Sequence, residues 1–309
     1  MRPPHKRIWL VSVWVTLFTF QVFPATAQNR GEKVKPDNKK NPSDATIFTS
    51  DTFIHRLLAG SSHYFSEILK KKEELGIQVI YTRIDRTKKN QYFYPSSTVK
   101  LPVAILALQK LNELNIPGLD KNSTMYTASA GERLSAVAND PSAPDGRPTI
   151  AHYIKKILLV SDNDAFNRLY EFLGQEYINN SLHKMGYVHT KIIHRLSISL
   201  SEEENRLANA VTFIDSNGKI LYYKPAERSN YPYKTTTIKM GKGFIRGNEL
   251  VNEPFDFSYK NAMPLQDLHQ IVKSILFPEA MPKEKRFNLT AADYIFLRRY
   301  MSMLPAESD

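Results

Sequence analysis

The most informative segment for the fold is Tyr94-Pro-Ser-Ser97-Thr-Val-Lys100-Leu-Pro-Val-Ala-Ile-Leu-Ala-Leu-Gln-Lys-Leu111. Its apolar residues continue over several turns, which predicts a long helix over residues 97–114, closed by Pro117-Gly118. Ser97 and Lys100 are three residues apart in the first turn, so their side chains lie on one face of this helix. A serine hydroxyl is a weak nucleophile unless a base takes its proton, and a lysine whose pKa is lowered by burial is such a base. On its own the spacing is a weak signal, because Ser97 also suits an ordinary N-cap.

A second motif, Ser161-Asp162-Asn163, follows an amphipathic helix predicted over residues 149–160. The apolar residues of that helix have the i, i+3, i+4, i+7 spacing of one buried face. Polar residues at this place are also ordinary turn chemistry. However, the two motifs in this order are those of class A β-lactamases and penicillin-binding proteins.

The sequence resembles the class A β-lactamase and related serine-hydrolase family over residues 51–304, including Arg195-Leu196 after the second motif. The resemblance implies an α+β fold, with a helical subdomain beside an antiparallel sheet. It implies that Ser97 is the acylated nucleophile, that Lys100 takes its proton and that Ser161 relays a proton to the lactam nitrogen. It also implies that Asn163 binds the lysine and a substrate amide. No cofactor or metal is implied.

The resemblance fails on the loop after Arg195-Leu196. In the family a glutamate four residues before an asparagine hydrolyses the acyl-enzyme, whereas the position four before Asn205 is Ser201. Three consecutive acids, Glu202, Glu203 and Glu204, are available, but such a run is more often a solvated loop or helix start. The sequence therefore assigns no deacylating base.

The family's third motif, Lys-Thr/Ser-Gly on a late strand, also lacks a clear counterpart. Lys239-Met240-Gly241 imitates it but precedes the helices expected at 264–276 and 290–304. We therefore expect Lys239 to belong to an inserted β-hairpin region at about 210–260, where Asn217-Gly218 is a strong turn signal. The sheet is expected to be incomplete at the C-terminus, and the chain a truncated or defective member of its family. The alternative is that Lys239 enters the site and completes it.

The N-terminal part has the pattern of an export signal. A basic start, an apolar run over residues 8–23 and the small-residue site Ala25-x-Ala27 predict a signal peptide over 1–27, cleaved before Gln28. The alternative, an uncleaved anchor, needs a longer run of about 20 residues. Residues 28–50 are polar and lysine-rich and predict a flexible linker, so the hydrolase domain is expected over 51–309. Localisation is expected to be secreted, in a bacterial periplasm.

Composition narrows the remaining classes. The chain of 309 residues has no cysteine, which excludes disulfides, thiolate metal sites and a cysteine nucleophile. Its eight histidines follow no metal-binding spacing, and its net charge of +11 is the only feature in favour of nucleic-acid binding. We expect a monomeric, exported acyl-serine hydrolase that needs no cofactor and acts on a β-lactam. The alternatives are a DD-peptidase-like enzyme acting on a peptidoglycan peptide, or a catalytically defective envelope-binding domain.

Overall fold

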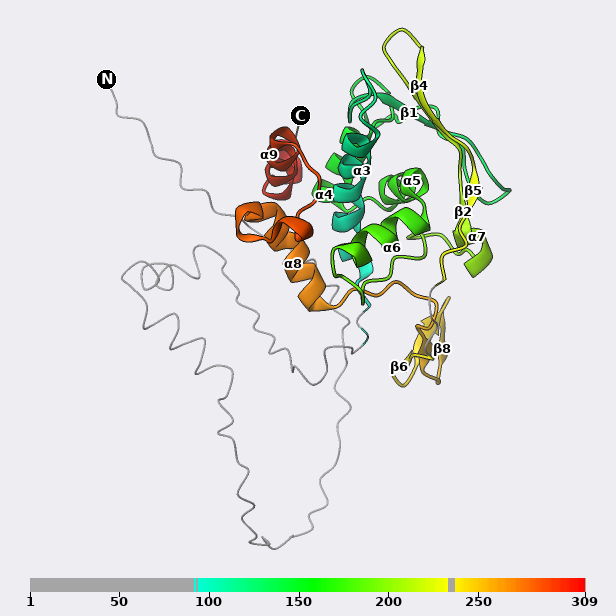
Figure 1. Ribbon diagram of the computed structural model, residues 1–309. Coiled ribbons are helices and arrows are strands. Elements are labelled where there is room, and N and C mark those ends of the chain that lie inside the picture. The colour runs from blue at the N-terminus through cyan, green and yellow to red at the C-terminus, as the bar shows by residue number, and fades with distance from the viewer. Residues whose placement is uncertain (1–91, 93, 233–236, 309) are drawn as a thin grey trace, which may run out of the picture. The chain divides into compact units, whose positions relative to one another are not determined.

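The computed structural model describes residues 92, 94–232 and 237–308 and combines helices with small antiparallel sheets (Figure 1). The predicted signal peptide and linker, and residues 51–91 of the predicted hydrolase domain, lie outside these described residues. The α-helices are α3 (Lys100–Leu114), α4 (Ile150–Val160), α5 (Asn163–Leu173), α6 (Gln175–Lys184), α7 (Glu202–Arg206), α8 (Leu265–Leu276) and α9 (Ala291–Met301). Short 3-10 helices are η2 (Ser96–Val99), η3 (Pro278–Ala280), η4 (Lys283–Lys285) and η5 (Pro305–Glu307).

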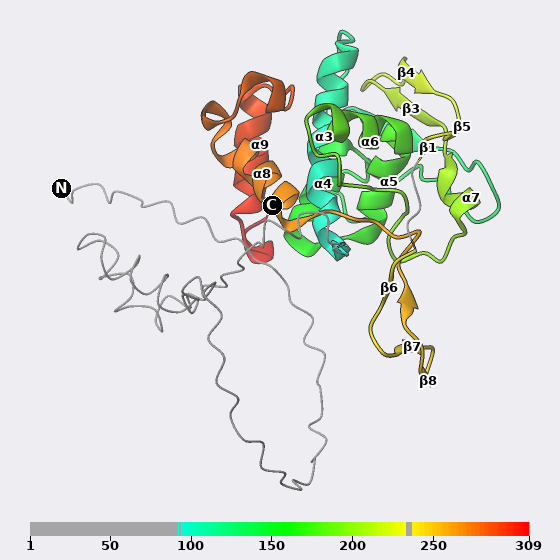
Figure 2. The same ribbon diagram turned by 60° about the horizontal axis from the view of Figure 1, so that its bottom comes forward.

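Helix α3 is the centre of the core. Residues 103–107 of this helix have no exposed surface, and an apolar helix that is buried on nearly all sides must be covered by its neighbours. Helices α4 and α5 pack directly against it. In both ribbon views α8 and α9 lie on one side of this group and the β1–β3–β4 sheet lies on the other (Figures 1 and 2). Each fully buried Leu or Ile contributes about 1.5–3 kcal/mol, so α3 is firmly anchored, and its first residue, Lys100, is buried with it.

The helix ends follow local capping chemistry. Helix α4 begins at Thr149, whose hydroxyl accepts the N–H of His152 at 3.0 Å, and α5 is capped by Gly174 at φ +74°. Helix α9, expected at 290–304, starts with a capping box formed by Thr290 and Asp293. Helix α3 ends at Leu114, as predicted, and its cap is Asn115 with φ +47°. An asparagine can adopt the left-handed cap conformation that usually takes glycine.

The main sheet has three antiparallel strands in the order β1-β3-β4. Strand β3 pairs with β1 and β4, and Phe213 of β3 meets Phe172 of α5 edge-on at 5.2 Å between ring centroids. The predicted hairpin at Asn217-Gly218 is present, with Gly218 at φ +79°. The sequence did not predict β1. The strands are β1 (Thr124–Thr127), β2 (Leu207–Ala208), β3 (Val211–Ile214), β4 (Ile220–Lys224), β5 (Glu227–Arg228), β6 (Lys239–Met240), β7 (Phe244–Arg246), β8 (Glu249–Val251) and β9 (Phe255–Asp256).

The strands after residue 237 form two small ribbons, β6 with β9 and β7 with β8, that extend away from the helices (Figure 2). Phe257, just after β9, packs against the rings of Tyr92 and Tyr94 at 5.6 and 5.4 Å between centroids. Tyr92 and Tyr94 are therefore held by aromatic packing.

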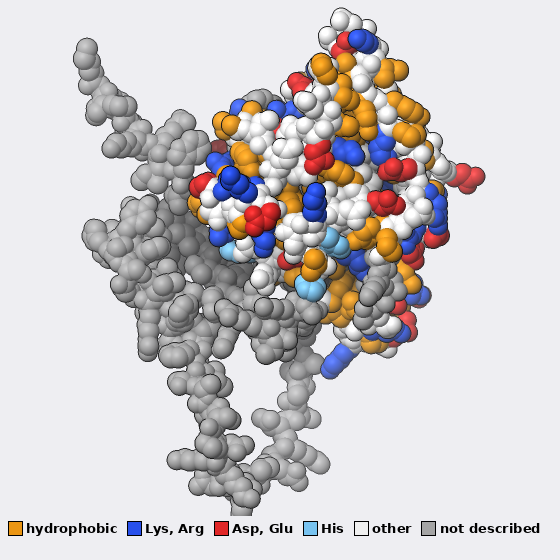
Figure 3. All heavy atoms as spheres, in the orientation of Figure 1, with side chains coloured by type: hydrophobic (Ala, Val, Ile, Leu, Met, Phe, Trp, Pro, Cys, Tyr) orange, Lys and Arg blue, Asp and Glu red, His pale blue; other side chains and the backbone are white. Residues whose placement is uncertain are grey.

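The described surface mixes both signs of charge. On the face seen in Figure 3, basic and acidic side chains are interspersed with apolar ones. The positive net charge is thus not gathered into one patch on this face. Within residues 92–308, apart from the gaps given above, no helix has the length and apolar character needed to cross a bilayer.

Candidate active site

Ser97 and Lys100 lie at the junction of η2 and α3. The turn is fixed by Thr98, whose N–H and hydroxyl both donate to the Pro95 carbonyl, at 3.0 and 2.7 Å. Ser96 has φ +48°, a sparsely populated conformation for a residue with a side chain. This geometry places Ser97 Oγ 3.1 Å from Lys100 Nζ. The first predicted motif is therefore a direct contact between hydroxyl and amine.

Ser161 reaches the same amine from the turn between α4 and α5. It caps α4 in the left-handed conformation, at φ +55°, with its N–H on the Ile157 carbonyl at 3.2 Å. Lys100 Nζ donates to Ser161 Oγ at 2.9 Å and to the Ser161 carbonyl at 2.5 Å. The next residue, Asp162, accepts the N–H of Ala165 at 2.7 Å and so begins α5. Two helix ends thus bring Ser97, Lys100 and Ser161 together.

Lys100 is suited to act as a base. The residue is 3% exposed, and burial lowers the pKa of its amine to about 8, with the Asp162 carboxylate acting in the opposite direction. An ordinary lysine is almost entirely protonated at neutral pH, whereas roughly a tenth of this one is neutral at pH 7. Neutral Lys100 has a lone pair that can accept the proton of the Ser97 hydroxyl.

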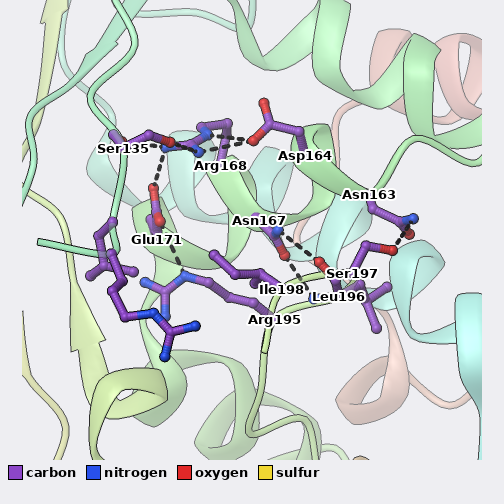
Figure 4. Close-up of a pocket in the computed structure, with 12 residues that line it drawn as sticks. Ser135, Asn163, Asp164, Asn167, Arg168, Glu171, Arg195, Leu196, Ser197 and Ile198 are labelled. Carbon is purple, nitrogen blue, oxygen red and sulfur yellow. Dashed lines mark hydrogen bonds and ion pairs between the residues drawn. The ribbon is translucent and has the colours of Figure 1, made fainter. Parts of the chain in front are cut away.

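Asn163 is the first residue of α5, and its contact differs from the expected one. Its Nδ2 donates to Ser197 Oγ at 2.6 Å, while the sequence led us to expect a bond to Lys100 (Figure 4). Ser197 has φ +55°. The Asn167 side chain binds the backbone of the neighbouring Leu196: its Oδ1 accepts the Leu196 N–H at 2.9 Å, and its Nδ2 donates to the Leu196 carbonyl at 3.0 Å. These contacts place Ser197 beside the second motif, which the sequence did not predict.

The family model described as the beta-lactamase enzyme family matches residues 65–274, more than half of the chain and all of the residues just described. The chain belongs to this beta-lactamase family. No significant match was found among curated proteins or solved structures. The α+β fold class predicted from the two motifs is thereby confirmed.

In this beta-lactamase-family chain a buried ion-pair network anchors the loop that begins at Arg195. Glu171 on α5 accepts from Arg195 Nε and from Arg168 Nη1, both at 3.1 Å (Figure 4). Arg168 also donates to the backbone and the hydroxyl of Ser135. Burial raises the pKa of Glu171, and the two guanidinium groups oppose that effect. The sequence singled out Arg195 but missed Glu171 and Arg168, whose roles appear only when the loop packs on α5.

The three acids considered as deacylating bases stabilise α7 and its surroundings. Glu204 forms a capping box with Ser201, and Glu202 pairs with Arg206 at 3.0 Å. Glu203 pairs with Arg228 of β5. Each of these carboxylates therefore has a structural partner on the loop or on β5.

A pocket of about 270 Å³ lies beside the Arg195 loop (Figure 4). Its lining includes Asn163 and Ser197, but among the described residues it does not include Ser97, Lys100 or Ser161. Of the second motif, only Asn163 lines this pocket. No cluster of three or more metal-ligating side chains occurs in the part of the chain that the structure describes.

Lys239, the first residue of the Lys239-Met240-Gly241 segment that imitates the family's third motif, lies on β6 with an exposed side chain. Strand β6 pairs with β9, where Lys239 is opposite Asp256. Hydrogen bonds from Ser258, together with the Lys239 charge, lower the pKa of Asp256. The described interactions of Lys239 are thus those of a ribbon residue, as expected for the inserted region.

Proposed function

We propose that this protein is an acyl-serine hydrolase of the β-lactamase type, with Ser97 as nucleophile and Lys100 as base. One observation supports this most strongly: a buried lysine amine lies within hydrogen-bond distance of two serine hydroxyls, at 3.1 and 2.9 Å. A lysine placed only for structure would be expected to form an ion pair, yet this amine bonds to two hydroxyls and a carbonyl.

The reaction follows from these contacts. Neutral Lys100 takes the proton of Ser97 as Oγ attacks the carbonyl carbon of a β-lactam. The carbon–nitrogen bond then breaks, and the departing nitrogen receives a proton from Ser161 Oγ, which Lys100 replenishes. The backbone N–H of Ser97, at the start of the helical segment, is suited to stabilise the developing oxyanion.

Asn163 is the proposed ligand for the amide side chain of the substrate. Its Nδ2 already donates to a hydroxyl, Ser197 Oγ, at the rim of the pocket. A substrate amide carbonyl can take the place of that acceptor. A β-lactam and an acyl-peptide of peptidoglycan both carry such an amide, so a DD-peptidase-like activity is the second candidate.

We further propose that hydrolysis of the acyl-enzyme is slow. Water needs a general base at the acyl carbon, and the loop group that contacts Asn163 is the Ser197 hydroxyl, which is a poor base. The nearby acids of α7 are held by Ser201, Arg206 and Arg228. Together with the predicted signal peptide, this favours an exported penicillin-binding protein of a bacterial envelope with weak turnover.

Fluorescent penicillin tests the proposal. Full-length protein should become covalently labelled, Ser97→Ala should lose the label, and Ser216→Ala should keep it because Ser216 lies exposed in the β3–β4 turn. Lys100→Ala should slow labelling by a large factor. Persistent labelling of Ser97→Ala, or a folded wild-type protein that is not labelled at all, would contradict the proposal.

A further inference from the structure

Lys156, near the end of α4, lies between two carboxylates. Its Nζ is 3.0 Å from Asp140 Oδ2 and 3.8 Å from Asp162 Oδ2. Asp140 is buried in the loop before α4 and also accepts from the Ser142 hydroxyl at 2.6 Å. His152 Nε2, on α4 itself, is 3.6 Å from Asp140 Oδ2. The Lys156 charge is therefore shared between one aspartate that precedes α4 and one that follows it.

The second of these carboxylates acts on Lys100. Asp162 directly follows Ser161, whose carbonyl and hydroxyl both bind the Lys100 amine. Among the charged groups of the described residues, Asp162 is the one that favours protonated Lys100 against the effect of burial. Lys156 partly neutralises this aspartate, and Asp140 in turn partly neutralises Lys156.

We propose that Lys156 is a positioning residue for Lys100: held between Asp140 and Asp162, its charge opposes the effect of the Asp162 carboxylate on that amine. The proposal rests on the role of Lys100 as base in the proposed function. Lys156 contacts Asp162, and no described contact joins it to Ser97.

Two substitutions should shift the pKa of Lys100 in opposite directions. Without the Lys156 charge, Asp162 is less compensated, protonated Lys100 is favoured and its pKa rises. Without the Asp140 charge, the cluster around Lys156 carries one negative charge fewer, so protonated Lys100 is less favoured and its pKa falls. Burial lowers the pKa of His152, so that residue is mainly neutral above pH 7 and changes neither sign. Loss of a purely structural support would not produce opposite shifts.

The experiment is a titration of Lys100 in the full-length protein without substrate, followed by NMR of lysine labelled with ¹³C at Cε. The signal is assigned by its loss in Lys100→Arg. We expect the midpoint to rise by roughly half a pH unit in Lys156→Gln, to fall by a similar amount in Asp140→Asn and to stay in place in Lys156→Arg. Lys155→Gln is the matched control, because Lys155 Nζ lies 5.1 Å from the centroid of the Tyr300 ring, beside α9.

Shifts in the same direction for Lys156→Gln and Asp140→Asn, or no shift in either, would overturn the proposal. A shift in Lys155→Gln equal to that in Lys156→Gln would also overturn it, because any helix charge would then have the same effect. The two failures can be told apart. If the proposed function is wrong, penicillin does not label the protein, whereas the titration of Lys100 is measured without penicillin. If the protein is labelled but the midpoints do not move, only the proposed role of Lys156 is wrong.

Discussion

The substitution Glu171→Gln tests whether the ion-pair network anchors the Arg195 loop. The Glu171 and Arg195 side chains are each 1% exposed and that of Arg168 is 5% exposed. A glutamine has one acceptor oxygen and no charge, so it cannot compensate two buried guanidinium groups at once. Both arginines would remain buried, with one of them facing an amide donor.

The expected loss follows from this burial. Removing one partner of a buried ion pair costs about 3–5 kcal/mol, because an uncompensated charge stays inside the protein. A domain of this size loses about 2–4 °C in Tm per kcal/mol, so the midpoint should fall by about 6–20 °C. Because the network holds the loop that carries Ser197, amide hydrogen exchange over residues 195–206 should rise more than elsewhere.

Thermal unfolding and hydrogen exchange measure these effects, with Asp164→Asn as the matched control. Asp164 also pairs with Arg168, at 2.9 Å, but its side chain is 58% exposed. An exposed pair contributes about 0–1 kcal/mol, so the control should barely change the midpoint. Equal midpoints for the two variants, or faster exchange spread evenly over the domain in Glu171→Gln, would show that the buried network does not anchor the Arg195 loop.

Three other outcomes follow. The acylation rate should rise about tenfold per pH unit and level off near pH 8, because the base is the neutral form of a lysine whose lowered pKa is about 8; a rate that falls between pH 6 and 8 would contradict this role. Ser197→Glu should release the penicilloyl label roughly 10²-fold faster than Ser197→Gln, because only the glutamate supplies a base. Glutamine is the control because it places a side chain of similar size on the same positive-φ backbone. Equal release rates would show that the missing base does not belong at position 197. Asn115→Ala should destabilise the protein by about 1 kcal/mol in urea unfolding because of the left-handed cap, whereas Asn115→Gly should not; equal losses would place the effect elsewhere.

Local signals explain which parts of the fold were predictable. Helix α4 was visible because its apolar stripe has a strong period and Thr149 is a good N-cap. The β3–β4 hairpin was visible because Asn217-Gly218 suits a tight turn. Strand β1 was not, because four residues give too short an alternation and its partner β3 is more than 80 residues away in sequence.

In the candidate site, too, local contacts could be predicted from the sequence and long-range contacts could not. The contact between Ser97 and Lys100 is local, so spacing in one helix was enough to predict their proximity. The contact between Asn163 and Ser197 depends on a positive φ in a loop, which no periodic pattern encodes. Glu171 is 24 residues before Arg195, and its role becomes visible only when the loop folds onto α5. Long-range polar pairs of this kind leave little trace in a single sequence.

Mass spectrometry of the protein after reaction with benzylpenicillin shows whether Ser97 is the residue that is acylated. Opening a lactam ring expels no group, so the adduct should add the whole mass of the antibiotic. Peptide mapping should place that mass on Ser97, and the adduct should be absent from Ser97→Ala and strongly slowed in Lys100→Ala. An adduct on another residue, or a folded protein that forms no adduct at saturating benzylpenicillin, would contradict the assignment of Ser97 and Lys100.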